Sequence, residues 1–364
     1  MHFELALLSI IILSWNTRDI TRNCLLSIFA NVDDLEYEVI VVDNNSHDGS
    51  AEIIEKEFSQ VKLIKNLENI GFARGNNQGF AISRGEYVLF LNSDTIVPSP
   101  NFISVIPAFN CGAITGKAGL KAGIHTKSND DSEIIDSRLR GNDNEVINKS
   151  PLRKMMEVMK NDSKIGALAP KLVYPDGEFQ DEFFRKIPSL AQTFWLYLLP
   201  MSKLTYKIDF LRKRYLTDIN PEKSVFVSDI NLPGTALLMP SKLCRDLGGW
   251  DEGTFYWLED VDLCQRIKKA GYKLYYFADA EIIHLGGASS AMWDDFKKMY
   301  NFRKAYLYYF RKHKSAFQSF LVKWLFILNA LTSAPFLLFF GIFKRRFWKK
   351  GIAALKFSWR FLGA

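Results

Sequence analysis

Short apolar runs alternate with helical periodicity through the first hundred residues. The apolar runs are rich in β-branched side chains, as in strands of a sheet covered on both faces, and they lie at residues 7–14, 38–42, 61–65 and 87–92. Between them, apolar side chains recur at helical spacing and predict helices at residues 19–30, 51–58 and 75–84. The alternation predicts an α/β fold with an open, mostly parallel sheet and its ligand site at the carboxyl ends of the strands.

The pattern breaks after Phe102. Residues 103–150 contain one aromatic side chain, Phe109, and are rich in Gly, Ser, Asn and Asp. A connection of this length is unusual within a compact domain, so we interpret it as an inserted, largely disordered surface segment. A functional lid loop is the alternative.

The α/β pattern returns near residue 165. Strands are predicted at residues 166–169, 225–227, 235–239, 273–277 and 281–284. An amphipathic helix is predicted at residues 257–270, ended by Gly271, and a further helix at residues 292–314. Residues 183–214 are aromatic and basic, and their pattern favours no single type of element.

Charge divides the chain unevenly. Residues 297–364 hold 15 Lys and Arg, no Asp or Glu, and 19 of the 51 aromatic residues, whereas the whole chain has a net charge of only +7. Basic charge mixed with aromatic and apolar side chains favours a membrane surface over nucleic acid as the partner. No recognisable nucleic-acid-reading module accompanies it.

Residues 324–343 carry no charge, and 20 residues are just enough to cross a bilayer. Basic clusters flank both ends, so a span would place one of them outside, against the usual cytoplasmic bias. We therefore favour an interfacial or re-entrant anchor, with a true span and a buried core helix as the alternatives. The apolar start at residues 5–15 follows Glu4 and is interpreted as a buried strand and not as a signal peptide. The four cysteines stand far apart and are interpreted as reduced cytosolic thiols: Cys24, Cys111, Cys244 and Cys264.

Polar residues follow several predicted strands. Asp43 ends a buried strand, where a carboxylate can bind a base or ribose, although a turn-forming Asp is the alternative. Residues 69–79 have glycines spaced by four, with Gly71, Arg74 and Asn76 near a helix start. This spacing fits neither of the common phosphate-binding glycine motifs, but it can line a polar ligand.

Carboxylates and one histidine suggest chemistry at the same edge. Asp94 follows an apolar strand and can bind a divalent cation that holds a diphosphate, or it can cap a turn. Glu259 and Asp260 fall in the first turn of a predicted helix, where a carboxylate can act as a general base, although acidic residues are common there. His284 ends a strand before two glycines and can complete a metal shell or serve a structural role.

Read together, these segments resemble the family 2 glycosyltransferases, and among them the bacterial rhamnosyltransferase-like branch. The matching stretches stand in family order at residues 10–16 (IIILSWN), 41–50 (VVDNNSHDGS), 69–73 (NIGFA), 91–95 (LNSDT), 248–252 (GGWDE), 259–264 (EDVDLC) and 284–287 (HLGG). The resemblance implies a GT-A fold, with a Rossmann-like, mostly parallel sheet and flanking helices. It also implies inverting transfer of a sugar from a nucleotide-diphosphate sugar, dTDP-rhamnose being one candidate, to a glycan or lipid-linked acceptor in cell-surface polysaccharide synthesis.

The resemblance also implies site residues. Those expected to bind the donor nucleotide are Ser14, Asn16, Asp43, Asn45, Gly71, Arg74 and Asn76. Asp94, with Asn92 in the first position of the D-x-D-like motif and with His284, is expected to bind Mg²⁺ or Mn²⁺. Asp260 is expected to be the base, with Glu259 orienting it or the acceptor.

The expected organisation is a catalytic domain at residues 1–290 and a basic, aromatic, membrane-associated region at residues 291–364. These expectations place the protein at the cytoplasmic face of the bacterial inner membrane. The rival hypothesis is a non-catalytic nucleotide-sugar-binding protein that the insertion at residues 103–150 has inactivated.

Overall fold

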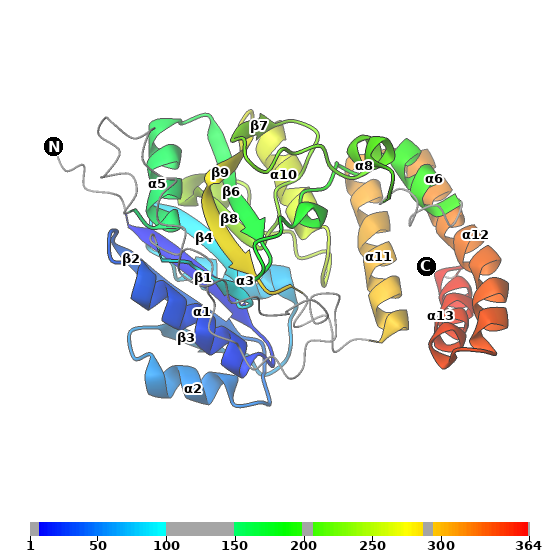
Figure 1. The fold of residues 1–364 in the computed structure, drawn as a ribbon, viewed down its shortest axis with the longest axis horizontal. Coiled ribbons are helices and arrows are strands. Elements are labelled where there is room, and N and C mark those ends of the chain that lie inside the picture. The colour runs from blue at the N-terminus through cyan, green and yellow to red at the C-terminus, as the bar shows by residue number, and fades with distance from the viewer. Residues whose placement is uncertain (1–6, 100–148, 199–206, 287–293, 363–364) are drawn as a thin grey trace, which may run out of the picture.

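A computed structural model describes residues 7–99, 149–198, 207–286 and 294–362. Its centre is a mixed sheet whose strands lie in the order β3-β2-β1-β4-β8-β6-β9-β5, with β7 paired to β9 (Figure 1). The strands are β1 (Leu8–Ser14), β2 (Tyr37–Asp43), β3 (Lys62–Lys65), β4 (Tyr87–Asn92), β5 (Thr95–Ile96), β6 (Ile165–Val173), β7 (Val225–Val227), β8 (Ala236–Pro240) and β9 (Lys273–His284). β1 to β4 are mutually parallel, and β8 runs antiparallel to both of its neighbours.

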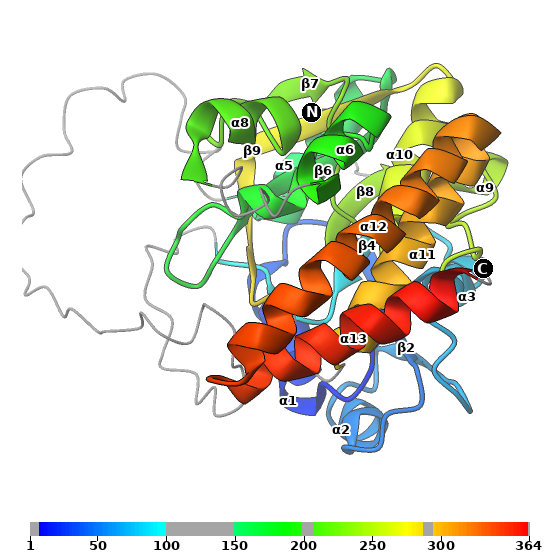
Figure 2. The ribbon, with the colours of Figure 1, turned by 90° about the vertical axis from the view of Figure 1, so that its right-hand side faces the viewer.

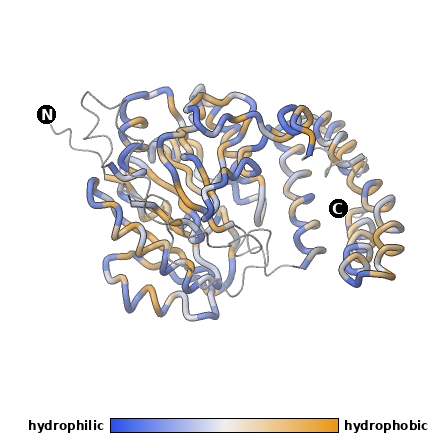
Figure 3. The backbone as a smooth tube through the Cα atoms, viewed as in Figure 1, coloured by the Kyte–Doolittle hydropathy of each residue, from blue (hydrophilic) through white to orange (hydrophobic). Residues whose placement is uncertain are grey.

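The sheet is covered by helices because its central strands are apolar on both faces, as Figure 3 shows along the strands. The helices of this part are α1 (Arg18–Asn31), α2 (Ser50–Glu57), α3 (Phe72–Ala81), α5 (Pro151–Asn161), α9 (Ser241–Asp246) and α10 (Glu259–Lys269). Gly75 and Gly79 let α3 lie directly on the sheet, since a Cβ at Gly79 would stand 2.6 Å from the side chain of Ile11. This close packing brings the loop before α3 to the carboxyl edge of β1 and β2.

The remaining helices lie beside the sheet (Figure 1), and all of them except the shortest contribute to a second apolar cluster. They are α6 (Leu190–Leu198), α8 (Asp209–Tyr215), α11 (Asp295–His313), α12 (Ala316–Gly341) and α13 (Arg345–Leu362). Figure 2 shows α12 and α13 side by side, and Gly341 permits this, since a Cβ there would lie 2.7 Å from the backbone of Trp348. α6 packs against α12 although it falls within the predicted catalytic domain in sequence.

Most strands and helices lie where the sequence pattern predicts them. Two differences have a plain cause. The predicted strands at 273–277 and 281–284 are one strand, β9. Its pairing with β6 continues past residues 278–280, which form an irregularity opposite the Pro170–Lys171 step of β6. The helix predicted at 257–270 begins two residues later, because Trp257 and Leu258 have left-handed φ values of 74° and 67°.

Three further predictions concern the insertion, the cysteines and the apolar segment of the tail. The predicted insertion at 103–150 lies almost wholly outside the described residues, as does Cys111. Cys24, Cys244 and Cys264 are buried and free. Among the described residues, α12 is the one helix long and apolar enough to cross a membrane, and about a third of it is buried against the rest of the protein.

Candidate active site

The loops after β1 and β2 are tied together at the carboxyl edge of the sheet. Asn16, at φ 51°, donates its backbone N–H to Ser46 Oγ at 2.8 Å, and its Oδ1 accepts from the backbone N–H of His47 at 2.7 Å. Ser14 is fully buried, and its hydroxyl lies 3.0 Å from Thr21 Oγ1 within a cluster of buried hydroxyls. These two residues therefore fix the shape of the edge through contacts within the protein.

Asp43 offers a buried acceptor at this edge. Its Oδ2 accepts from the backbone N–H of Ser46 at 2.9 Å, while its Oδ1 is buried and has no hydrogen-bond partner among the described residues. Unsatisfied buried acceptors are uncommon in native proteins, and one at a sheet edge is well suited to a ligand donor. Asn45, next along the chain, holds the turn at φ 63°.

The loop before α3 joins this edge to a distant segment. Gly71 has φ 89°, and a Cβ there would lie 2.7 Å from the carbonyl oxygen of Phe255, so this position requires glycine. Arg74 is exposed and pairs with Glu252 at 3.2 Å. Asn76 is buried and donates to the carbonyl of Phe72 within α3 at 3.0 Å. Asp43 and Gly71 thus lie at the edge, whereas the amide nitrogen of Asn76 is used inside the helix.

Asp94 and His284 meet across the sheet. Thr95 pairs with His284 between β5 and β9, and this register brings Asp94 Oδ1 within 3.3 Å of His284 Nε2. Gln180 orients the imidazole: its Oε1 lies 2.8 Å from His284 Nδ1, while its Nε2 donates to the His284 carbonyl at 2.7 Å. Because Oε1 can only accept, Nδ1 carries the proton, and Nε2 is left to face the carboxylate.

This pair fits a divalent cation. A neutral Nε2 and a carboxylate oxygen are both electron-pair donors, so a positive charge between them, either a proton or a metal ion, is needed to stabilise the pair. Within the described residues no third His, Cys, Asp or Glu joins them, and a metal shell here would need oxygens from a bound ligand and water. The backbone N–H of Asn92 donates to the carbonyl of Thr235 at 2.8 Å, and its own carbonyl accepts from Thr95 Oγ1 at 2.8 Å.

Glu259 and Asp260 begin α10 and are distinguished by their hydrogen bonds. Burial, with a smaller contribution from the neighbouring charge of Asp260, raises the pKa of Glu259 to about 8. Burial also raises the pKa of Asp260, but the backbone N–H groups of Val261 and Gly234 oppose that rise by binding its ionised form. Of the two carboxyl groups, Asp260 is therefore the more readily ionised, as is required of a base, and Glu259 is the one that retains its proton longer as the pH rises.

Tyr256 lies close enough to Asp94 and to the carboxylates of α10 to be affected by the charges of all of them. Burial raises the pKa of its phenol, and the negative charges of Glu259, Asp94 and Asp260 raise it further, so all three carboxylates act on the same side chain. The structure therefore brings Asp94, with His284, to the same region as the start of α10. Tyr256 and Gln180 are polar residues of the site that the sequence analysis did not single out, and only their positions in the fold identify them.

Comparison with known proteins finds a family match in the first part of the chain. Residues 9–115 match the model of the family described as Glycosyl transferase family 2. This segment of the chain therefore carries the sequence pattern of that family. The match agrees with the fold, because the mostly parallel sheet with flanking helices is that of the GT-A glycosyltransferases.

The relatives of this chain differ in the length over which they match it. The uncharacterized glycosyltransferase YfnE of Bacillus subtilis is 38% identical over 90 residues, 24% of this chain and 23% of that protein. The N-acetylglucosaminyl-diphospho-decaprenol L-rhamnosyltransferase of Mycobacterium tuberculosis is 22% identical over 254 residues, 68% of this chain and 66% of that protein. This chain spans about a quarter of the length of the first of these relatives.

Among solved structures, the mannosyltransferase PcManGT of Pyrobaculum calidifontis, in complex with GDP-Man and Mn²⁺, is similar at a TM-score of 0.47 and 14% identity. The match covers 97% of this chain and 87% of that one.

Proposed function

We propose that this family 2 glycosyltransferase moves a sugar from a nucleotide-diphosphate sugar to a hydroxyl of a glycan or lipid-linked acceptor, with inversion at the anomeric carbon. The observation that supports it best is the convergence of two groups at one sheet edge. One group is a carboxylate–histidine pair suited to a cation, and the other is a pair of carboxylates with differently stabilised ionised forms.

The proposed mechanism is a single displacement. The nucleoside binds against Asp43, whose unpartnered Oδ1 can accept a hydrogen bond from the base or ribose. Asp260 accepts the proton of the acceptor hydroxyl while that oxygen attacks the anomeric carbon, and the bond to the nucleoside diphosphate breaks. The protonated Glu259 keeps a second negative charge away from Asp260 and can donate a hydrogen bond to the acceptor.

Asp94 and His284 are the residues proposed to hold Mg²⁺ or Mn²⁺, while Asn92 is kept as a candidate third ligand. When bound, such an ion supplies electrostatic stabilisation of the charge that develops on the leaving diphosphate. Gln180 would keep the imidazole in the tautomer whose Nε2 can coordinate the ion.

The first test is the Asp260→Asn variant. Asparagine preserves the shape of the side chain but cannot accept the proton, so transfer should fall by about 10²–10⁴. Donor binding, measured by thermal shift with a panel of nucleotide sugars and Mn²⁺ that includes dTDP-rhamnose, should be unchanged. Asp246→Asn, an exposed carboxylate of α9, is the matched control, and normal turnover by Asp260→Asn would overturn the assignment.

The competing proposal is a nucleotide-sugar-binding protein inactivated by the segment at residues 103–150, which begins near Asp94 in the sequence. The two proposals differ in donor hydrolysis, which a glycosyltransferase commonly performs slowly without an acceptor. Metal-dependent hydrolysis that is lost in Asp260→Asn supports transfer, and tight donor binding without any hydrolysis or transfer supports the binding protein.

We further propose that the protein acts at the cytoplasmic face of the bacterial inner membrane, in the synthesis of a cell-surface polysaccharide. The support is the tail, whose helices expose large apolar side chains beside basic residues. The most exposed of these apolar side chains include Phe317, Phe336, Phe343 and Trp359.

A further inference from the structure

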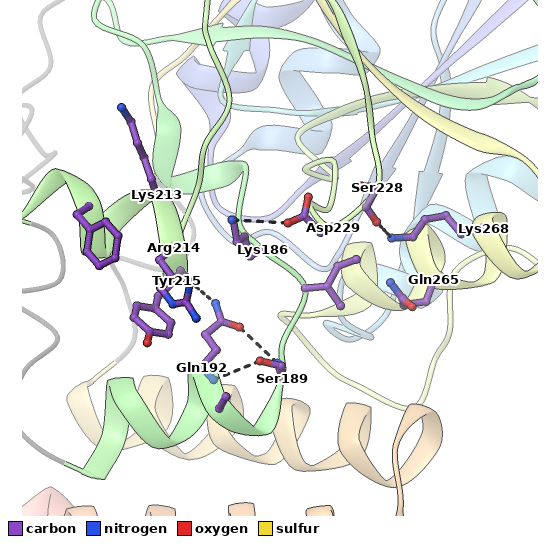
Figure 4. A pocket seen from close by; sticks show the side chains of 13 residues that line it. Lys186, Ser189, Gln192, Lys213, Arg214, Tyr215, Ser228, Asp229, Gln265 and Lys268 are labelled. Carbon is purple, nitrogen blue, oxygen red and sulfur yellow. Dashed lines mark hydrogen bonds and ion pairs between the residues drawn. The ribbon is translucent and has the colours of Figure 1, made fainter.

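A large cavity lies apart from the carboxylates, between α6, α8 and α10 (Figure 4). Its volume is about 730 Å³, which is within the range of small-molecule sites. Four cations line it, Lys186, Lys213, Arg214 and Lys268, against the single carboxylate of Asp229. We call it the basic cavity.

Two of the four cations are already neutralised by ion pairs. Lys186 lies 3.1 Å from Asp218, and Lys213 lies 2.9 Å from Asp209. Arg214 and Lys268 have no carboxylate within ion-pair distance among the described residues. Arg214 lies over the ring of Tyr215, and Lys268 donates to the carbonyl of Ser228 at 2.6 Å. These two cations are therefore available to an anionic ligand.

Gln265 adds an uncharged donor to the basic cavity. Its Nε2 is buried and has no hydrogen-bond partner among the described residues. A buried donor that is left unpaired costs free energy, which a ligand acceptor would recover. Burial also lowers the pKa of Lys268, so an anion beside it would favour its charged form. Cations and an unpaired N–H in one cavity suit phosphate oxygens.

The basic cavity is connected to the proposed base by two short paths. Gln265 stands five residues after Asp260 on α10, which is about 7.5 Å along the helix axis. Residues 185–187 pair with residues 229–231, and they run from Arg185, whose charge lowers the pKa of Asp260, to Lys186 in the cavity wall. The cavity wall and the proposed base are thus both carried by α10.

We propose that the basic cavity binds the phosphate or diphosphate group that joins an acceptor sugar to its lipid, and so orients the acceptor hydroxyl toward Asp260. The inference rests on the proposed transferase function and specifies its acceptor class. The apolar side chain of Phe210 in the cavity wall, 69% exposed, offers a surface for the first part of the lipid. Nearby α6 packs against the apolar helix α12, which would keep the rest of the lipid at the membrane.

The first experiment measures anion binding without any turnover. Inorganic pyrophosphate is titrated calorimetrically into the full chain with a chelator present, so that no metal-bound diphosphate forms at Asp94. We expect binding that weakens at least tenfold in the double variant Arg214→Gln/Lys268→Gln. It should be unchanged in Asp43→Asn and in the control Lys56→Gln/Lys242→Gln, whose lysines are exposed elsewhere. Absent binding, or equal binding by the double variant, would overturn the proposal.

The second experiment identifies the source of the phosphate. Transfer is compared between an acceptor sugar carrying a lipid diphosphate and the same sugar carrying a methyl group. The double variant should raise the KM for the diphosphate acceptor at least tenfold and leave both the KM for the methyl glycoside and the donor KM unchanged. Equal effects on both acceptors, or an effect on the donor, would contradict an acceptor phosphate site. Loss of binding to phosphatidylglycerol vesicles without any acceptor effect would assign the cavity to a phospholipid headgroup instead.

The proposed transferase function and the proposed acceptor site would be contradicted by different results. Pyrophosphate binding by the wild type with no transfer to any acceptor would contradict the proposed function while leaving an anion site. Transfer that proceeds normally in the double variant would contradict the acceptor site while leaving the function.

Discussion

The adjacent carboxylates Glu259 and Asp260 show how the hydrogen bonds available at each position stabilise the ionised forms of two similar residues differently. Both are drawn into an apolar surrounding at the start of α10, which penalises their ionised forms. Asp260 receives backbone hydrogen bonds that restore part of the lost hydration, whereas Glu259 Oε2 has no hydrogen-bond partner among the described residues. The preceding left-handed residues, Trp257 and Leu258, force the chain into this arrangement, and such strain is commonly found at functional sites.

This difference predicts a pH effect for Glu259→Gln. In the folded wild type Glu259 ionises at about 8, and in the unfolded chain at about 4.3, so between these values the folded state binds the extra proton. The wild type should therefore lose stability as the pH rises through this window. Glutamine removes the titration, and the variant should show a flatter dependence of the unfolding temperature between pH 5 and 9.

The activity of the same variant provides the second measurement. Glutamine resembles the protonated glutamate, so transfer at pH 7 should stay within about threefold of wild type, whereas any change of kcat/KM near pH 8 should disappear. Glu252→Gln, an exposed glutamate, is the control. A variant with the same stability profile as wild type would show that Glu259 does not hold a proton in this window.

The sequence predicts the residues of the site better than their partners. Asp43, Asp94, Asp260 and His284 are identifiable because each follows a strand or begins a helix in a motif. Gln180 lies 104 residues from His284 in the chain, so nothing local in the sequence joins them.

At the scale of elements, α10 is held by a helix of the tail. Asp262 Oδ1 lies 2.7 Å from Lys312 Nζ and 2.6 Å from His313 Nε2, both on α11. Lys312 also pairs with Asp251 in the loop before α10, and Arg266 pairs with Asp262 at 2.6 Å. The helix that carries the proposed base is thus joined to the C-terminal helices by buried or half-buried charges.

Removing the shared cation should loosen this junction. In Lys312→Gln, Asp251 and Asp262 lose a common partner, and because the lysine is about a third exposed the cost should be about 1–2 kcal/mol of unfolding free energy. Denaturant unfolding measures the stability, and kcat should fall severalfold as the start of α10 becomes less fixed. Lys304→Gln, on the exposed face of the same helix, is the matched control. Equal stability of the two variants would show that the junction contributes nothing.

Sequence patterns predict elements well where local periodicity decides the structure. The strands around β1 are predicted closely because their apolar runs need both faces covered. The sequence pattern predicts two strands in place of β9 because Asp279, which lies at the irregularity of β9, is a residue type typical of turns. α6 and α8 are not predicted, since α6 is apolar nearly all round and takes its place only by packing on α12.

At the scale of the whole molecule, the acidic and the basic parts of the chain form surfaces with different proposed roles. The proposed catalytic residues and Asp43 lie in the part of the chain that carries the acidic excess. The tail, with 15 basic and no acidic residues after position 296, packs one side of its helices into the second apolar cluster. Its other side exposes aromatic residues such as Phe336 and Trp359. Exposed aromatic side chains interspersed with lysines are typical of a surface that lies in the headgroup region of a membrane.

This arrangement predicts binding to anionic membranes without a span. The full chain should float with vesicles containing phosphatidylglycerol, bind less at high salt, and be released by alkaline carbonate, because α12 uses part of its surface to pack on α6 and α13. Trp348→Ser/Trp359→Ser should weaken vesicle binding about 10²–10⁴-fold, since each of the two large side chains buried in the interface contributes about 1.5–3 kcal/mol. Leu67→Ser/Ile82→Ser, which removes exposed apolar residues from the catalytic part, should bind as wild type does. Retention of the protein in carbonate-washed membranes would instead indicate that α12 spans the bilayer.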